Sequence, residues 1–271
     1  MNRGVMLKAA IETWPSTLLC GLLLFAAEAA LAYVIPTFQG ELSESLSQMR
    51  FLQNFVGAML GVRVANQLGP DAFAAFPWVH PVVLAIVWAH ALVCCTRTPA
   101  GEVDRGTADM TMTLPVTRFD ILLSESIVWM VAGAIVLAMG LAGNLFGSQY
   151  VTNAEVPPLD RTLRVLVNLY FTYLAVGGFS WLVSAGSNRR GPAMTVVFVA
   201  LLASFLINFL AQFWDPADRI SWLSVLYYYR PMFILRDGVL PWSDLAALGG
   251  TFAVLWGAAA VVFGRRDVVT T

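Results

Sequence analysis

The sequence has very little lysine. Lys8 is the single lysine among 271 residues, and it stands between Leu7 and Ala9. A phosphate-binding P-loop needs the pattern Gly-x-x-x-x-Gly-Lys-Ser/Thr, in which backbone amides and the lysine surround the phosphates. HExxH and GxSxG motifs are also absent from the sequence. We therefore expect that this chain is not an enzyme, binds no cofactor and has no catalytic residues.

Charged residues and cysteines are also scarce. Only 12% of the residues are charged and 58% are apolar, whereas soluble proteins average about 25% charged residues. This composition favours a membrane protein and argues against a nucleic-acid partner. Three cysteines do not make a disulfide framework. His90 and Cys94 are four residues apart on one expected helix, but no second ligand pair accompanies them, so we expect no metal site.

Long apolar runs predict an all-α integral membrane protein with six transmembrane helices. A run of about 20 apolar residues is enough to cross a bilayer. We expect one membrane domain over residues 1–271, with spans at Pro15–Thr37, Pro77–Cys95, Phe119–Leu145, Leu163–Ala185, Pro192–Trp214 and Ser243–Gly264. The run Phe51–Gly61 is too short to span, and we expect it on the outer surface or capping the bundle.

The N-terminal residues allow two interpretations. Met1–Ala32 has a basic start and an apolar run, as a cleavable signal peptide would. Glu12 and Glu28 interrupt that pattern, so we favour an interfacial helix over Arg3–Trp14, with Pro15 turning the chain into the first span.

Basic residues set the predicted orientation, because cytoplasmic loops carry an excess of Lys and Arg. With the N-terminus inside, nine of the 16 basic residues fall on the inner side and seven on the outer side. The inner loops are shorter and carry Arg-Arg pairs directly at span ends, which strengthens the N-in, C-in prediction. Tryptophans are predicted interface anchors near the outer boundary (Trp78, Trp214, Trp222, Trp242) and the inner one (Trp14).

The segment between the second and third spans is the most informative part of the chain. Its sequence, GEVDRGTADMTMTLPVTR over residues 101–118, is too polar for hydrocarbon and predicts a loop at a membrane face. Thr107–Leu114 has no helix breaker and is followed by Pro115, which predicts a short helix with Thr107 at its start. Met110 and Leu114 share one stripe of this helix with Thr107. A short helix between two spans offers a handle by which another protein can move them.

This segment resembles the cytoplasmic loop of type-2 ATP-binding-cassette (ABC) transporter permeases. The family pattern runs approximately E-x-x-x-G-T-x-x-x-x-x-x-L-P-V-S-R, which this chain matches at Glu102, Gly106, Thr107, Leu114, Pro115, Val116, Thr117 and Arg118. Gly264–Val268, Gly-Arg-Arg-Asp-Val, is similar to the family's usual ending. A departure is the polar Thr-Ala-Asp-Met-Thr-Met-Thr stretch where the family has a Leu-rich helix.

The resemblance implies a function. It makes the chain the permease subunit of an ATP-driven transporter in a bacterial inner membrane, working with a second copy or a paralogue and with separate ATPase subunits that bind ATP and Mg. The family expectation is export, with the second and fifth spans at the contact between the two halves. It also implies an ATPase-coupling site at Glu102, Arg105, Gly106, Thr107, Met110, Leu114, Pro115 and Arg118.

Polar residues within the spans leave alternatives open. Glu28 lies near the middle of the first span and either lines a pathway or makes a structural hydrogen bond. Asn168 and Asn208 are further polar candidates, with interhelical bonding as the simpler role. The spans hold no ring of charge, which favours a hydrophobic or amphiphilic substrate. Two other functions remain possible: a non-transport membrane partner protein, or an ion-coupled secondary transporter using Glu28.

Overall fold

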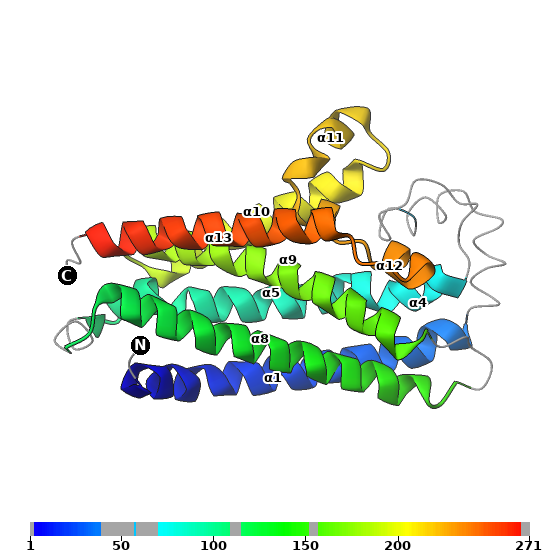
Figure 1. The fold of residues 1–271 in the computed structure, drawn as a ribbon, viewed down its shortest axis with the longest axis horizontal. Coiled ribbons are helices and arrows are strands. Elements are labelled where there is room, and N and C mark those ends of the chain that lie inside the picture. Colours follow the sequence, from blue (N-terminus) through cyan, green and yellow to red (C-terminus); the bar gives the residue numbers. More distant parts are fainter. Residues whose placement is uncertain (1–2, 39–56, 58–69, 109–114, 152–156, 267–271) are drawn as a thin grey trace.

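The computed structural model describes residues 3–38, 57, 70–108, 115–151 and 157–266. Within these residues all regular structure is helical, and six helices are long and apolar enough to cross a membrane (Figure 1). The candidate spans are Arg3–Thr37, Asp71–Cys95, Arg118–Ser148, Leu159–Gly186, Arg190–Leu210 and Trp242–Arg265. Each overlaps one predicted run, so the all-helical, six-span fold is confirmed. The predicted surface segment Phe51–Gly61 lies outside the described residues, apart from Gly57.

The spans and the short elements between them follow in chain order. The spans are formed by α1 (Arg3–Thr37), α4 (Pro70–Val79) with α5 (Pro81–Cys95), α8 (Arg118–Ser148), α9 (Leu159–Gly186), α10 (Arg190–Leu210) and α13 (Trp242–Arg265). The shorter elements are η2 (Arg97–Gly101), α6 (Glu102–Asp104), α11 (Asp215–Arg219), η3 (Ser221–Leu223), η4 (Val225–Tyr228) and α12 (Pro231–Asp237).

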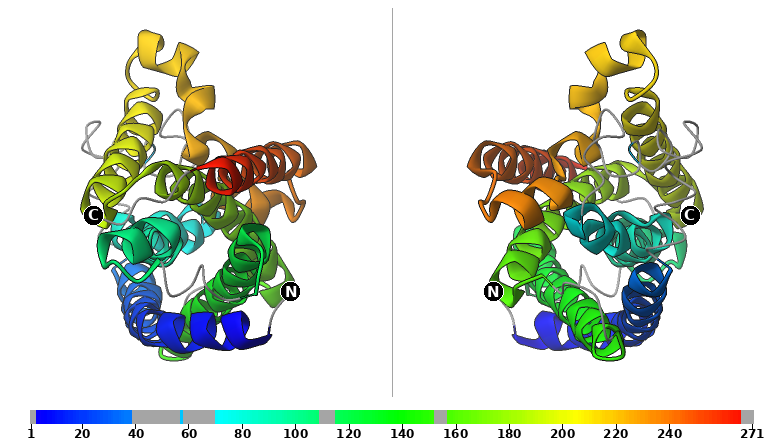
Figure 2. Two further views of the ribbon diagram at one scale, coloured as in Figure 1. Left: turned by 90° about the vertical axis from the view of Figure 1, so that its left-hand side faces the viewer. Right: turned by 90° about the vertical axis from the view of Figure 1, so that its right-hand side faces the viewer.

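Helix α1 is continuous through Pro15, so Arg3–Trp14 forms the first turns of α1 and not a helix of its own; its position at the membrane interface stays a prediction. Proline removes one main-chain hydrogen bond and crowds the preceding turn, which bends a helix rather than necessarily ending it. Here the hydroxyls of Ser16 and Thr17 donate to the carbonyl of Thr13 at 2.8 and 2.9 Å, which adds bonds beside the proline. In Figure 2 the first, dark-blue turns of α1 lie across the end of the bundle, at an angle to the rest of the helix.

The second span is broken where the sequence places His80 before Pro81. His80 has an extended backbone, Pro81 occupies the first turn of α5, and the His80 Nδ1 accepts a hydrogen bond from the Val82 amide at 3.3 Å. The span begins at Asp71, six residues before the predicted start at Pro77. Pro77 does not begin the helix but lies inside α4. Trp78 is 1% exposed, so its prediction as a lipid-interface anchor is wrong: it packs in the protein core.

Helices α1 and α8 make the most extensive contact in the bundle. A Cβ atom placed on Gly143 would lie 2.1 Å from the carbonyl oxygen of Phe25, and one on Gly147 would lie 2.1 Å from that of Ala29. The two backbones therefore touch, as small residues permit between membrane helices. This contact fixes the position of α1 along α8.

Helices α5 and α9 are the most buried spans, while α10 and α13 lie at the periphery with much of their apolar surface exposed. Helix α13 packs along α9, and α5 contacts α1, α8, α9 and α10. The first turn of α1 and the last turn of α13 lie at the same end of the bundle, where α8 and α10 also begin and α5 and α9 end (Figure 1). We call this the proximal end.

Candidate functional site

The segment after the second span turns sharply at the proximal end. After α6, Gly106 has φ +69°, a conformation that favours glycine. The amide of Gly106 bonds the Val103 carbonyl at 3.1 Å, and the amide of Thr107 bonds the Glu102 carbonyl at 2.9 Å. This pair of bonds is the Schellman pattern that closes a helix. The Gly106-Thr107 pair of the motif therefore terminates helix α6. The next residue, Ala108, is buried.

Glu102 is buried against α1. It is 3% exposed, and its carboxylate forms an ion pair with Lys8, the only lysine of the chain, from the first turns of α1. From the sequence alone, a carboxylate in a polar loop at a membrane face is expected to be exposed to water. The fold instead brings together two residues 94 positions apart, so Glu102 attaches the segment to α1.

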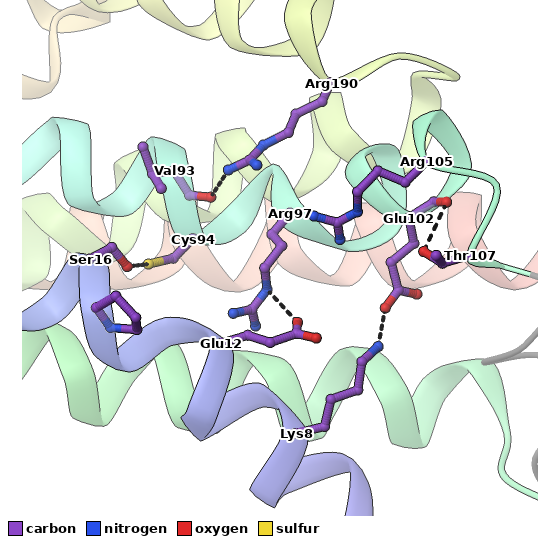
Figure 3. Close-up of a pocket in the computed structure, with 11 residues that line it drawn as sticks. Lys8, Glu12, Ser16, Val93, Cys94, Arg97, Glu102, Arg105, Thr107 and Arg190 are labelled. Carbon is purple, nitrogen blue, oxygen red and sulfur yellow. Dashed lines mark hydrogen bonds and ion pairs between the residues drawn. The ribbon is translucent and has the colours of Figure 1, made fainter.

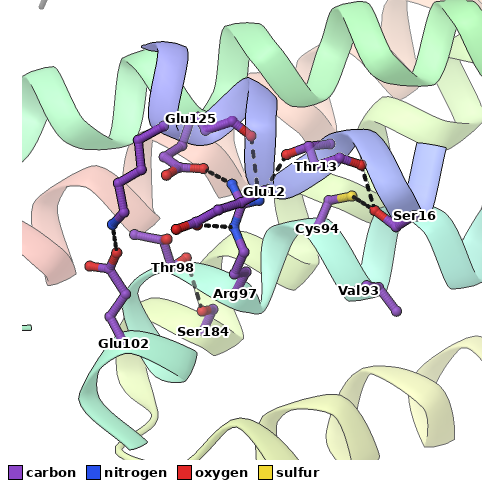
Figure 4. A network of polar contacts seen from close by, with 12 residues as sticks. Glu12, Thr13, Ser16, Val93, Cys94, Arg97, Thr98, Glu102, Glu125 and Ser184 are labelled. Atoms are coloured by element: carbon purple, nitrogen blue, oxygen red, sulfur yellow. Dashed lines mark hydrogen bonds and ion pairs between the residues drawn. The ribbon is translucent and has the colours of Figure 1, made fainter. Parts of the chain in front are cut away.

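A second charged group lies next to this pair (Figure 4). The Arg97 guanidinium binds the buried carboxylate of Glu125 at the start of the third span, donates to the Thr13 hydroxyl at 2.9 Å and lies 3.4 Å from a carboxylate oxygen of Glu12. The side chains of Arg97 and Glu125 are 9% and 3% exposed. Their interaction is therefore shielded from water, and it connects α1, the end of the second span and α8.

Hydrogen bonds attach the segment to α9 as well. The Ser184 hydroxyl donates to the Thr98 carbonyl and accepts from the Ala100 amide, both at 3.3 Å. The segment that leads into the loop is thus held on two sides, by α1 and by α9.

Arginines at the proximal end also bind the carbonyls left free where helices end. Arg118 donates to the carbonyls of Phe263, at 3.1 Å, and of Arg266, both at the end of α13. Arg266 in turn donates to the carbonyls of Ala185 and Ser187 at 2.8 and 2.9 Å, where α9 ends. Cations at helix C-termini satisfy free carbonyls and complement the helix dipole. The two segments that resemble the permease family, distant in sequence, therefore contact each other.

A cavity of about 620 Å³ opens beside these contacts (Figure 3). It lies between α1, the end of α5, the turn around α6 and the start of α10. Its lining is rich in charge and consists of Lys8, Glu12, Pro15, Ser16, Val93, Cys94, Arg97, Glu102, Arg105, Thr107 and Arg190.

Comparison with protein-family models identifies the family of the chain. The model described as "ABC-2 family transporter protein" matches residues 11–268, nearly the whole chain. The chain belongs to the ABC-2 transporter family. No curated protein matches it. The chain is therefore a membrane permease component of an ABC transporter, a family whose permeases work in general with an ATP-binding cassette ATPase.

The described part of the permease holds six of the eight predicted coupling residues. Glu102, Gly106, Thr107 and Arg118 are engaged in the contacts above, while Pro115 and Arg105 are exposed. The exposed Arg105 makes no ion pair with the described residues. Met110 and Leu114, the apolar stripe of the predicted coupling helix, lie outside the described residues.

Glu28 is completely buried between α1 and α8. One carboxylate oxygen accepts a hydrogen bond from the Asn144 amide at 2.9 Å. Glu28 lies with Leu24 on the face of α1 that contacts α8, and it is not part of the lining of the charged cavity. This geometry favours the structural hydrogen bond among the roles considered for Glu28.

Asn168 holds a bend of the chain at the other end of the bundle. Its amide donates to the Tyr228 carbonyl at 3.1 Å, and its side-chain oxygen accepts from the Arg230 amide at 3.0 Å. Between them, Tyr229 donates to the Trp78 carbonyl at 3.1 Å, and burial raises the pKa of its hydroxyl well above its usual range. Asn168 therefore fixes the backbone that precedes α12.

Asn208 is half-buried near the end of α10. It lines a cavity of about 250 Å³ with polar and aromatic side chains that include Gln212, Tyr227 and Arg230. The three polar candidates of the spans are thus separated: Glu28 lies between α1 and α8, Asn168 holds a bend, and Asn208 borders a small cavity.

The second and fifth spans form an apolar cavity of about 620 Å³. It lies between α5 and α10, and most of its surface comes from aliphatic and aromatic side chains. The lining residues are Pro81, Leu84, Ala85, Trp88, Ala89, Leu92, Met194, Thr195, Phe198, Leu201, Leu202 and Phe205.

Sequence reasoning missed the partners of the loop. The sequence alone gives Lys8 no partner, and Glu125 is one residue within the predicted third span. One signal was available for the ion pair of Arg97 and Glu125. Glu125 lies one or two turns inside the third span, and Arg97 lies at the end of the second span. Only folding shows that Arg97 and Glu125 form a pair.

Proposed function

We propose that the permease is one half of the membrane domain of an ATP-driven exporter, and that residues 102–118 dock a separate ATPase subunit. The observation that carries this proposal is the attachment of both ends of the segment. Glu102 is paired with Lys8 of α1, and Arg118 begins α8 while binding the end of α13.

Rigid attachment matters because a force applied to a loose loop would be lost before it reached the spans. A push on the segment here is transmitted to α1 through Lys8 and to α8 through the main chain. The exposed Arg105 and the predicted Met110 and Leu114 stripe supply charge and apolar surface for a partner. ATP and Mg are bound by that partner in this proposal.

The second half is a further copy or a paralogue that packs on α5 and α10. The apolar cavity between these helices and the exposed face of α10, where Phe198 is 61% exposed and Val199 56%, support this interface. An apolar surface of this kind also fits a hydrophobic or amphiphilic substrate moving along it. We place the membrane domain over residues 1–271 in a bacterial inner membrane, with both termini in the cytoplasm.

Family membership favours this function over the two alternatives drawn from the sequence. An ion-coupled transporter would use Glu28 as a titrating group on the pathway, yet Glu28 is packed against α8 and bonded to Asn144.

The docking proposal is tested with Leu114→Asp. A charge at the centre of an apolar contact is expected to reduce co-purification of the ATPase by about tenfold or more, since burying an unpaired charge costs more than one hydrogen bond is worth. The matched control is Leu223→Asp, an equally polar change at an exposed leucine of η3 (60% exposed).

Both variants should insert into the membrane as wild type does. Full complex formation and coupled ATP hydrolysis by Leu114→Asp would show that the segment is not the docking element.

A further inference from the structure

The charged cavity at the proximal end has more cations than its own carboxylates neutralise. Four basic side chains line it, from α1, η2, the turn after α6 and α10, against two carboxylates. The lining therefore carries a formal charge of plus two. The cations are Lys8, Arg97, Arg105 and Arg190, and the carboxylates are Glu12 and Glu102.

Two of the four cations, Arg105 and Arg190, have no carboxylate partner among the cavity-lining ion pairs. Lys8 is paired with Glu102, and Arg97 with Glu12 and with Glu125 behind it. Neither Arg105 nor Arg190 forms a salt bridge with the residues that the structure describes. Asp104, a further carboxylate beside Arg190, is exposed and accepts a hydrogen bond from the main-chain amide of Arg190 at 3.2 Å and not from its guanidinium.

Arg190 is held in place with donors to spare. One nitrogen of its guanidinium donates to the Val93 carbonyl at 2.9 Å, while its Nε is buried without a hydrogen-bond partner. The Nε is closed to solvent, so the donors open to a ligand are those of the two terminal guanidinium nitrogens. Its stem rests against Gly101, where an added Cβ would lie 3.2 Å from the Arg190 Cδ.

The arginines also repel one another. Figure 3 shows the side chain of Arg105 extending toward Arg97 at the rim of the cavity, and the charges of both act unfavourably on Arg190. An anion placed among them removes this repulsion and accepts the unused donors. Guanidinium groups match the geometry of phosphate oxygens and bind them in pairs of parallel hydrogen bonds.

We propose that this cavity binds a phosphate group, with Arg105 and Arg190 donating to its oxygens. The cavity lies where α5 ends and α10 begins, the level at which we expect lipid phosphates beside these spans, and Pro15 and Val93 add an apolar wall. The headgroup of an anionic phospholipid and inorganic phosphate share the recognised chemistry. The proposal does not depend on ATPase docking, because all four cations belong to this chain.

The test uses the full purified chain. It is placed in nanodiscs of phosphatidylcholine with or without phosphatidylglycerol, and native mass spectrometry counts the lipids retained after release. The double variant R105Q/R190Q should retain anionic lipid about tenfold less than wild type, since each lost charge-assisted bond weakens binding substantially. The single variant Arg105→Gln, at an exposed residue, should show a smaller loss without any effect on folding.

Arg189→Gln is the matched control, because Arg189 is exposed, adjacent in sequence and absent from the cavity lining. It should retain lipid as wild type does. A second arm titrates inorganic phosphate against chloride in phosphatidylcholine discs and follows thermal unfolding. Stabilisation of wild type but not of R105Q/R190Q identifies free phosphate as a ligand, whereas lipid retention alone identifies the headgroup.

Three results would overturn the proposal: no binding of either form to wild type, equal binding to R105Q/R190Q, or an equal loss in Arg189→Gln.

Discussion

Replacing Arg97 with methionine is expected to destabilise the permease strongly. The guanidinium is almost fully buried and serves several acceptors at once: the Glu125 carboxylate, the Thr13 hydroxyl at 2.9 Å, the Ala9 carbonyl at 3.5 Å and the Glu12 carboxylate at 3.4 Å. Methionine retains much of the apolar stem but no donor. Glu125, at 3% exposure, would then be a buried charge without its counterion.

The magnitude follows from burial. Removing one partner of a buried ion pair costs about 3–5 kcal/mol. Glu125→Gln should cost less, about 1–2 kcal/mol, because glutamine still accepts a hydrogen bond and Arg97 keeps Glu12. At about 2–4 °C per kcal/mol for a chain of this size, the expected loss in Tm is roughly 6–20 °C for Arg97→Met and roughly 2–8 °C for Glu125→Gln.

The assay is thermal unfolding of the purified chain in one detergent, followed by tryptophan fluorescence. The double variant R97M/E125L provides the decisive comparison, since two apolar side chains leave no buried charge unpaired. It should recover a substantial part of the Tm lost by Arg97→Met alone. Equal losses for Arg97→Met and Glu125→Gln, or a double variant whose losses simply add, would refute the reasoning.

Three further predictions concern packing, the intramembrane carboxylate and catalysis. Gly143→Val should separate α1 from α8, because its Cβ would lie 2.1 Å from the Phe25 carbonyl oxygen. It should therefore lower Tm far more than the control Gly257→Val on α13, whose Cβ meets nothing within 4 Å. Comparable Tm values for the two variants would contradict the close contact. Glu28→Gln should leave Tm and transport nearly unchanged, because glutamine can still accept from Asn144, and a loss of transport with normal folding would instead assign Glu28 to the pathway. The purified chain should show no ATP hydrolysis, since Lys8 lies in no P-loop; turnover above a lipid-only control in contaminant-free protein would disprove this.

Hydropathy alone identified the six spans, because a bilayer demands about 20 apolar residues in succession and little else satisfies that demand. The limits of the spans were less accurate. The second span is predicted to begin at Pro77, whereas α4 already includes residues 71–76, with Pro77 inside the helix. Pro15 predicts a boundary between two helices, yet α1 continues through it.

Local chemistry also made parts of the loop predictable. Gly106 before Thr107 marks a left-handed turn, and Thr117 begins α8 by accepting from the Asp120 amide at 3.0 Å. Such features depend on residues close together in sequence. Proline after the predicted helix and the family-like spacing pointed to the same segment.

Which charges are exposed was decided only by the tertiary structure. Glu102, predicted as part of the ATPase-coupling site, is buried against Lys8, and Arg118 binds the end of α13. The cavity with Arg105 and Arg190 likewise joins side chains from separate helices. A single sequence records how apolar each segment is, and that determines which segments enter the membrane. It does not record which helices become neighbours, and the partner of a charge is set by those neighbours.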